Sequence, residues 1–304
     1  MIPQFPQFKK LELTDREAVL AITTQFSPYS DFDFGSMWAW DFSERMFISN
    51  LNGNLVIKFT DYMNGEYFYT FIGREHVSKT ANELISHATA IGIQTGLKLI
   101  PEVVALKLDS TLFSITEDSD NLDYVLSVEK LASYDGPELA SKRRALNIFM
   151  RRTPNYRFEI IDLESEKVRY EIDKLFIVWH TQKIESGDLA SDSAHEYTAL
   201  KRCIASAGTL NLTAAGLYIE DRLVAFWVLG LLNNGYSISH FEKADIKKYQ
   251  GIFPFFKKLV AEHLLTQKIT RINLEQDLGI PGLRQSKKAY FPVEFLHKYK
   301  VTRH

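Results

Sequence analysis

Cysteine is nearly absent from the sequence, which contains only Cys203 among 304 residues. A single cysteine excludes an internal disulfide and any metal site built on several thiolates. The glycine patterns G-x-G-x-x-G and G-x-x-x-x-G-K-[ST] are missing, and so are the G-x-S-x-G and H-E-x-x-H motifs. These absences argue against dinucleotide-binding proteins, P-loop NTPases, nucleophile-elbow hydrolases and zinc peptidases.

Long apolar runs and a strong net charge are missing as well. The longest apolar run, residues 223–232, is half of the roughly 20 residues that a membrane-spanning helix needs. Lys and Arg total 36 against 38 for Asp and Glu, so the formal charge is −2 and a generally basic nucleic-acid surface is not expected. The first six residues lack a basic segment followed by an apolar one, so we expect no signal peptide and a cytoplasmic protein.

Two stretches of the chain carry the same order of predicted elements. The first contains β-rich runs at residues 46–48, 55–59 and 67–72, joined by Asn52-Gly53 and Asn64-Gly65. Asn-Gly between such runs predicts hairpin turns and therefore a three-stranded meander. A helix over residues 82–91 and a strand over 103–108 are expected to follow, and residues 14–17 fit a capping box before an earlier helix.

The second stretch repeats this order after a Gly136-Pro137 turn and a helix. We expect strands at residues 214–219, 223–232 and 236–242, a helix at 251–266 and a further strand at 269–274. The prediction is an α+β protein with two mixed, mostly antiparallel sheets and packed helices, divided into domains 1–135 and 136–304. The order of meander, helix and strand resembles GNAT-like acyltransferase folds, which implies two such domains in tandem.

Residues 239–251 hold the first group of candidate functional residues. Because a strand alternates its faces, His240 and Glu242 are expected to project to one side and Lys243 to the other. Gly251 then begins a helix, where unpaired backbone N–H groups suit a phosphate. The alternative is an ordinary helix entry.

A second group follows the last predicted strand. Asn273, Glu275 and Asp277 lead into Gly279, and Arg284 and Lys287 come shortly after. Acids beside bases at a strand end, with glycines that let a ligand approach the backbone, predict a binding site. A charged surface loop is the alternative.

Several motifs in this order resemble the C-terminal catalytic domain family of phosphatidylglycerol lysyltransferases. The matching segments are residues 30–40, 123–125, 142–149, 242–245, 273–279, 282–287 and 290–292. The resemblance implies a tandem GNAT-like fold and aminoacyl transfer from a charged tRNA to a lipid head group. The sequence departs from the family pattern at Arg144, Leu274 and Lys257, where the family has Asn, Arg and Asn.

Transfer of an acyl group from an ester requires orientation of both partners, stabilisation of an oxyanion and removal of a proton. We expect Asp277 to hold an amino group and Arg284 to bind a phosphate or carboxylate. Lys243 and Lys287 would add positive charge, and Glu242 or His240 would act as the base. An ion pair between Lys243 and Asp277 is the structural alternative.

The expected function is an acyltransferase, with aminoacyl-tRNA or acyl-CoA as co-substrate and no tightly bound cofactor. The acceptor would be a small molecule, a peptide or a lipid head group. A tRNA acceptor end would need a basic track, for which the candidates are Lys142, Arg143, Arg144, Arg151, Arg152, Lys247, Lys248, Lys257 and Lys258. A non-catalytic ligand-binding or regulatory module on the same fold is the alternative.

Overall fold

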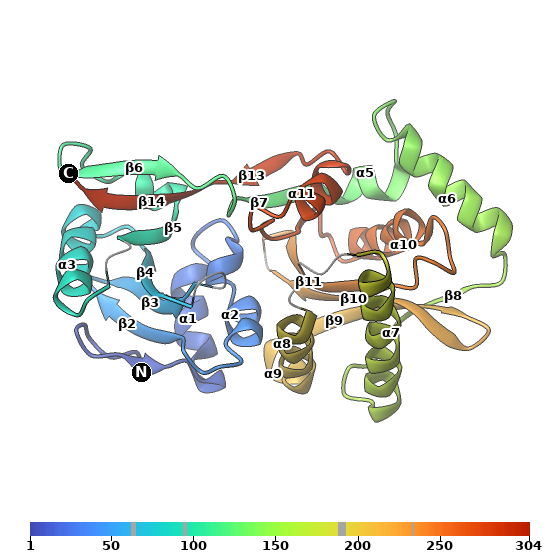
Figure 1. Cartoon of the computed structure of the whole chain (residues 1–304), viewed down its shortest axis with the longest axis horizontal. Helices are drawn as coiled ribbons and strands as arrows, with labels where there is room; N and C mark the ends of the chain where they lie inside the picture. Colours follow the sequence, from blue (N-terminus) through green and yellow to red (C-terminus); the bar gives the residue numbers. More distant parts are fainter. Residues whose placement is uncertain (62–64, 94–95, 188–192, 233) are drawn as a thin grey trace. The chain divides into compact units, whose positions relative to one another are not determined.

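The computed structural model describes residues 1–61, 65–93, 96–187, 193–232 and 234–304. The chain forms two compact units. Unit 1 comprises residues 1–124, 276–284 and 295–304, and unit 2 comprises residues 125–275 and 285–294. Each unit contains most of one seven-stranded mixed sheet, so the predicted α+β class with two mixed sheets is confirmed (Figure 1).

The sheet of unit 1 has the order β1-β2-β3-β4-β5-β14-β6. Its strands are β1 (Lys9–Lys10), β2 (Phe47–Leu51), β3 (Asn54–Thr60), β4 (Tyr67–Ile72), β5 (Leu97–Pro101), β6 (Phe113–Glu117) and β14 (Lys298–Arg303). The helices are α1 (Arg16–Thr23), α2 (Phe34–Trp40), α3 (Val77–Ala90) and α4 (Glu102–Ala105). The predicted meander is β2, β3 and β4, and α3 crosses over to β5, which pairs with β4 in parallel.

The sheet centred on unit 2 has the order β13-β7-β12-β11-β10-β9-β8. Its strands are β7 (Asp123–Ser127), β8 (Arg157–Ile160), β9 (Leu212–Ile219), β10 (Arg222–Leu231), β11 (Tyr236–Ala244), β12 (Arg271–Asn273) and β13 (Glu294–Leu296). The helices are α5 (Val128–Ser133), α6 (Ala140–Arg152), α7 (Glu166–Glu185), α8 (Ser193–Ala205), α9 (Ala207–Leu210) and α10 (Ile252–Thr266). A further helix, α11 (Pro281–Lys288), begins in unit 1 and ends in unit 2.

Unit 2 repeats the topology of unit 1. Strands β9, β10 and β11 form the antiparallel meander, and α10 crosses over to β12, which pairs with β11 in parallel. Strand β10 is buried along most of its length. Helix α7 contacts β10 and β11, whereas α10 packs against α5 and α6 over the main apolar core. The core side chains include Trp227, Phe255 and Phe256.

The division of the chain differs from the expected domains 1–135 and 136–304. The chain leaves unit 1 after Tyr124 and returns to it twice near the C-terminus. The physical reason is strand pairing: β14 lies between β5 and β6 and bonds to both, so the last residues complete the sheet of unit 1. Figure 1 shows β14 in red beside the green β6.

Two local predictions are wrong, and the last predicted strand is shorter than expected. Residues 103–108 do not form a strand, because β5 ends at Pro101 and helix α4 begins at Glu102. The capping box near the N-terminus uses Glu12 and Asp15 rather than residues 14–17. The last predicted strand is only Arg271–Asn273, since Glu275 adopts a positive φ of 60° that ends extended pairing. Asn64 lies outside the described residues.

Candidate functional site in unit 2

Strand β11 extends well beyond the end of its parallel neighbour. The pairing of β11 with β12 covers only Tyr236, Ser237 and Ile238, whereas β11 itself continues to Ala244. Side chains from residues 239–244 therefore project beside a part of the sheet where β12 has already ended. Crevices at strand ends of this kind are a usual place for ligand sites in mixed sheets.

A β-bulge lies in β11 at His240. Val228 of β10 pairs with Phe241, but the next residue, Leu229, pairs with Ser239, so His240 is the extra residue. The simple alternation predicted for His240 and Glu242 is therefore wrong at this point. Ser239, rather than His240, lies on the same face of β11 as Glu242, since the indole N–H of Trp227 donates to the Ser239 hydroxyl at 2.8 Å.

Glu242 lies on the face of β11 that is covered by α10. Its Oε2 accepts a hydrogen bond from the Lys257 ammonium, and the two side chains are 16% and 5% exposed. Lys257 Nζ also lies 4.1 Å from the centroid of the Trp227 ring. The other carboxylate oxygen, Oε1, is buried and has no hydrogen-bond partner in the described part of the chain. Glu242 therefore retains one unused acceptor in a low-dielectric environment.

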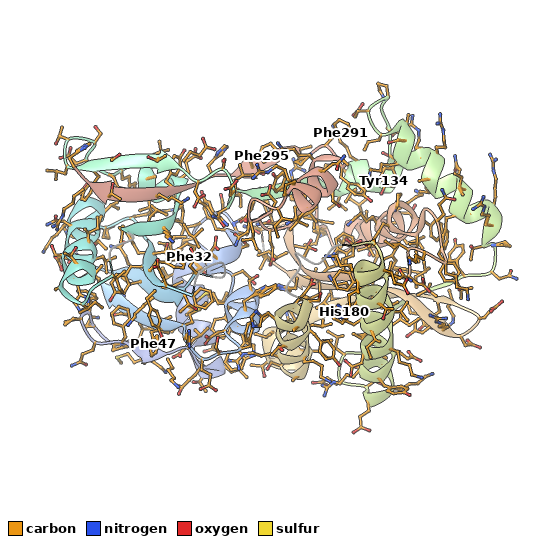
Figure 2. The ribbon with its side chains drawn as sticks, viewed as in Figure 1. Phe32, Phe47, Tyr134, His180, Phe291 and Phe295 are labelled. Atoms are coloured by element: carbon orange, nitrogen blue, oxygen red, sulfur yellow. The ribbon has the colours of Figure 1, made fainter. Side chains whose placement is uncertain are left out.

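Two buried tyrosines accompany this carboxylate. Tyr134 caps the C-terminus of α5 and is labelled in Figure 2, and Tyr290 follows α11. Burial raises the pKa of Tyr134, with further contributions from Tyr290 and the negative charge of Glu242. Burial and Glu242 raise the pKa of Tyr290 in the same way. Both phenols are therefore neutral hydrogen-bond donors throughout the physiological range, and the Tyr134 hydroxyl has no partner in the described part of the chain.

Lys142 of α6 completes this group. Its Nζ lies 4.1 Å from the centroid of the Tyr290 ring, and Lys257 Nζ lies 5.2 Å from the same centroid. We call the set the Glu242 cluster, and its members are Glu242, Lys257, Trp227, Tyr134, Tyr290 and Lys142. All of them belong to unit 2.

The sequence interpretation included Glu242 in the site but missed most of its neighbours. Lys257 was expected on an exposed basic track, yet it is buried. The sequence did contain a signal that Lys257 is buried and paired. Lys257 lies on the same helical stripe as Val260, Ala261 and Leu264, where a charged residue requires a buried partner. Tyr290 lies in the matching segment 290–292, whereas no comparable signal marked Tyr134, since aromatic residues at helix ends are ordinary core residues.

Lys243 projects to the opposite face of β11, as its position in the strand predicted. Its Nζ bonds to Glu196 of α8 at 2.5 Å and lies 4.0 Å from the Trp179 ring centroid. This Lys–Glu–Trp arrangement resembles that of Lys257, Glu242 and Trp227, but Glu196 has no unpartnered buried oxygen in the described part of the chain. The ion pair of Lys243 is therefore with Glu196.

His240, Asn273 and Glu275 form a separate contact group. The Nδ1 of His240 lies 3.8 Å from a Glu275 carboxylate oxygen, and the Glu275 backbone N–H donates to the Asn273 side chain at 2.7 Å. The His240 ring packs over Gly230, where a Cβ atom would lie 2.9 Å from Nε2. Asn273 and Glu275 are thus linked through the backbone of Glu275.

Asp277 and Arg284 contact each other within unit 1. Asp277 is fully buried and accepts hydrogen bonds from Arg284 Nε at 2.8 Å, from an Arg284 terminal nitrogen at 2.9 Å and from the Gly279 N–H at 2.8 Å. The Tyr124 hydroxyl donates to it as well. Burial opposes ionisation of Asp277, but the hydrogen bonds from Arg284 and Tyr124 outweigh burial and lower its pKa. Arg284 also bonds to Asp120 at 2.6 Å, so its guanidinium is largely occupied by carboxylates of the protein.

The remaining predicted ligand-binding residues have structural contacts. Lys287 donates to the Leu274 carbonyl at 2.6 Å. Gly251 is the N-cap of α10 with a φ of 84°, and an added Cβ would lie 2.1 Å from the Ala145 carbonyl oxygen. Helix α6 therefore covers the position where a phosphate was expected.

The expected basic track is interrupted. Lys142 and Lys257 face Tyr290, and Arg143 donates to the carbonyls of Tyr134 and Gly136. Lys247 pairs with Glu185 and Lys258 with Glu262. The arginines of α6 that remain exposed are Arg144, Arg151 and Arg152. Lys247 and Lys248 are exposed as well, whereas Lys142, Arg143, Lys257 and Lys258 are half-buried or buried, so only part of the expected track is exposed.

Substitution of Gly251 by alanine is expected to lower the free energy of unfolding by about 2 kcal/mol or more, because alanine is strained at positive φ and its Cβ would meet Ala145. Thermal or urea unfolding measures the change. Gly282→Ala is the matched control, since nothing lies within 4 Å of its Cβ position in α11. Equal stability of the two variants would contradict the packing role of Gly251.

Two features are absent from the described residues. No group of three or more His, Cys, Asp or Glu side chains is arranged to hold a metal ion in this part of the chain. None of the helices described here combines the length and apolar character required to cross a bilayer.

Comparisons with known proteins agree with the topology. No curated protein matches the chain. A conserved protein of unknown function from Bacteroides thetaiotaomicron has a solved structure that is 25% identical, with a TM-score of 0.83 and full coverage of both chains. L-PGS from Bacillus licheniformis is 15% identical, with a TM-score of 0.63 and coverage of 100% of this chain and 94% of that chain. FemX is 10% identical, with a TM-score of 0.57 and coverage of 97% and 95%.

The family model described as "Phosphatidylglycerol lysyltransferase, C-terminal" matches residues 23–302. This match spans both units and every member of the Glu242 cluster. The expectation drawn from the sequence motifs is thereby confirmed, and the chain belongs to the phosphatidylglycerol lysyltransferase C-terminal family.

Proposed function

We propose that the protein is an aminoacyltransferase that binds the aminoacyl group of its donor at the Glu242 cluster and transfers it to an amine or hydroxyl acceptor. Membership of a lysyltransferase family supports acyl transfer in general. The observation that carries the proposal is the pair of unpartnered buried polar atoms, Glu242 Oε1 and the Tyr134 hydroxyl. One accepts a hydrogen bond and the other donates one.

An aminoacyl ester supplies both missing partners. Its ammonium group would donate to Glu242 Oε1, and its carbonyl oxygen would accept from the neutral Tyr134 phenol. A buried group without a partner costs about 1–3 kcal/mol, which a complementary ligand recovers on binding. The same phenol would stabilise the negative charge that develops on the carbonyl oxygen during attack.

An aminoacyl donor fits this cluster better than a simple acyl donor. An acetyl or fatty acyl group has a carbonyl but no ammonium, so it would leave Glu242 Oε1 unsatisfied. We therefore favour aminoacyl-tRNA over acyl-CoA as the donor. The acceptor belongs to the class of small molecules, peptides and lipid head groups.

Binding of amino-acid amides tests the proposal directly, because an amide has the ammonium and carbonyl of the donor without its leaving group. Calorimetry with a panel of L-amino-acid amides is expected to find at least one that binds. Removal of the ammonium charge by N-acetylation should weaken that binding roughly tenfold or more, the value of one charge-assisted hydrogen bond. Tyr134→Phe should weaken it as well.

Two results would contradict the proposal. The first is equal binding of an amide and its N-acetyl derivative, and the second is binding of acetyl-CoA with no binding of any amide. Glu196→Gln is the control variant, because it alters the similar Glu–Lys–Trp group on the other face of β11. We expect its amide affinity to match that of the wild type.

A ligand-binding module without catalysis is the second candidate. The observation in its favour is that Asp277 and Arg284 are used in contacts with each other and with Asp120. The two functions differ in turnover: a module binds the amide but transfers nothing from any aminoacyl-tRNA to hydroxyl or amine acceptors.

A further inference from the structure

Lys142 is a half-buried lysine that has no carboxylate partner in the described part of the chain. Three other buried lysines of the described residues are each ion-paired: Lys243 with Glu196, Lys257 with Glu242, and Lys298 with Asp31 and Asp123. Lys142 instead lies over the Tyr290 ring, on the helix face that packs toward α10. Its amine therefore lies in the Glu242 cluster without a counter-ion of its own.

The ionisable groups around Lys142 are a lysine, a glutamate and two tyrosines. Lys257 on α10 is positive and Glu242 on β11 is negative, and these two neutralise each other in their ion pair. Tyr134 and Tyr290 are neutral, since burial and Glu242 raise the pKa of both phenols. A protonated Lys142 would thus leave one uncompensated positive charge in the cluster.

Burial lowers the pKa of Lys142 below its ordinary value of 10.5, and the nearby Lys257 charge lowers it further. A lower pKa increases the fraction of neutral amine at mildly alkaline pH. A neutral amine has the free electron pair that attacks a carbonyl carbon. Desolvation combined with a second cationic group is a recognised way of activating a lysine nucleophile.

We propose that Lys142 is an acylation site, at which the protein takes an acyl group from an ester or thioester onto its own ε-amine. The amine nitrogen attacks the carbonyl carbon and forms a C–N bond, and the C–O or C–S bond of the donor breaks. The nitrogen releases one proton, which the departing alkoxide or thiolate takes up. The products are an amide on Lys142 and a free alcohol or thiol, so no oxidant or further reactant is needed.

Acylation of Lys142 would remove its positive charge and place an amide beside Tyr290. For the natural donor, the inference rests on the proposed function, because the Glu242 cluster would bring the carbonyl group of that donor to the Lys142 amine. The reactivity of the amine itself does not depend on that function. A small ester without an ammonium group therefore tests the two separately.

The experiment treats the purified full chain with limiting p-nitrophenyl acetate, and in parallel with acetyl-CoA, between pH 6.5 and 10. Peptide mass spectrometry then measures acetylation of every lysine. We expect Lys142 to react faster than other lysines with p-nitrophenyl acetate, with a midpoint in its pH–rate profile below 10.5. Lys142→Arg should abolish that modification and leave the remaining sites unchanged.

Lys174 is the internal reference. Its Nζ also lies over a tyrosine ring, 4.3 Å from the centroid of Tyr170, but it is exposed on α7, and among the described residues no second lysine lies over that ring. Lys257→Met removes the neighbouring positive charge and should raise the midpoint of the pH–rate profile of Lys142. Acetylation of Lys142 at pH 8 should then slow roughly threefold or more, which corresponds to a rise of about half a unit in the pKa of Lys142. The rate at Lys174 should stay the same.

Two outcomes would overturn the inference: equal rates at Lys142 and Lys174 in the wild type, or a pH midpoint for Lys142 that does not respond to Lys257→Met. Glu242→Gln separates this inference from the proposed function. That variant loses the ammonium acceptor, yet it makes the cluster more positive, so acetylation of Lys142 by p-nitrophenyl acetate should persist. Retained amide binding in Glu242→Gln, together with retained Lys142 labelling, would sink only the role of Glu242 in donor binding.

Discussion

Replacing Glu242 with glutamine is expected to reduce the rate of aminoacyl transfer at least 100-fold. Glutamine keeps the shape of the side chain and can still accept a hydrogen bond from Lys257, but it loses the negative charge that holds the donor ammonium. A misplaced or unbound donor loses the advantage of orientation, and loss of one such electrostatic contact costs about 10²–10³ in rate. The measurement is transfer of labelled amino acid from a mixture of aminoacyl-tRNAs to amine and hydroxyl acceptors.

Glu242→Gln is also expected to lower the stability of the protein, because Lys257 would be left buried without its counter-charge. The double variant Glu242→Gln/Lys257→Met removes both charges and should restore stability without restoring transfer. Glu196→Gln, which breaks the similar pair on the other face of β11, should keep transfer close to the wild-type rate. Retained transfer in the double variant would show that Glu242 is not part of the site.

Replacing Asp277 with alanine is expected to lower the free energy of unfolding by about 3–5 kcal/mol. The carboxylate is fully buried, and its removal leaves the Tyr124 hydroxyl, the Gly279 N–H and part of the Arg284 guanidinium without their acceptor. Breaking a buried pair by removing one partner has costs of this size. Urea unfolding at pH 7 measures the change.

Asp120→Ala is the matched control for Asp277→Ala. Asp120 also bonds to Arg284, but its side chain is 54% exposed, so solvent screens the interaction and we expect a loss of about 1 kcal/mol or less. If Asp277→Ala unfolds like the wild type but has lost transfer activity, the structural role is wrong and the role predicted from the sequence motif gains support.

The pH dependence of stability follows from the lowered pKa of Asp277. Because the folded-state pKa lies below the ordinary value of 3.8, the ionised carboxylate stabilises the folded protein at all higher pH values. This contribution declines as the pH falls from about 4 through the folded-state pKa. The stability difference between wild type and Asp277→Ala should therefore be constant near neutrality and decrease in acid.

Local sequence patterns determined the repeated order of meander, helix and strand in both halves. Asn52-Gly53 predicted a hairpin because both residues must adopt positive φ, and the alternating or continuous apolar runs predicted which segments form strands. Burial of apolar faces and turn geometry are properties of neighbouring residues. They are therefore accessible from the sequence without knowledge of the rest of the fold.

Tertiary structure decided which charged groups meet. The sequence does not show which partner each charged motif residue takes. In the fold, Asp277 bonds to Arg284, Lys243 to Glu196, and Glu242 to Lys257. The bulge at His240 and the return of β14 to the first sheet were likewise not visible locally. Charge pairing, bulges and strand insertion depend on groups far apart in the chain, and only the folded arrangement specifies which of several equivalent partners lies within reach.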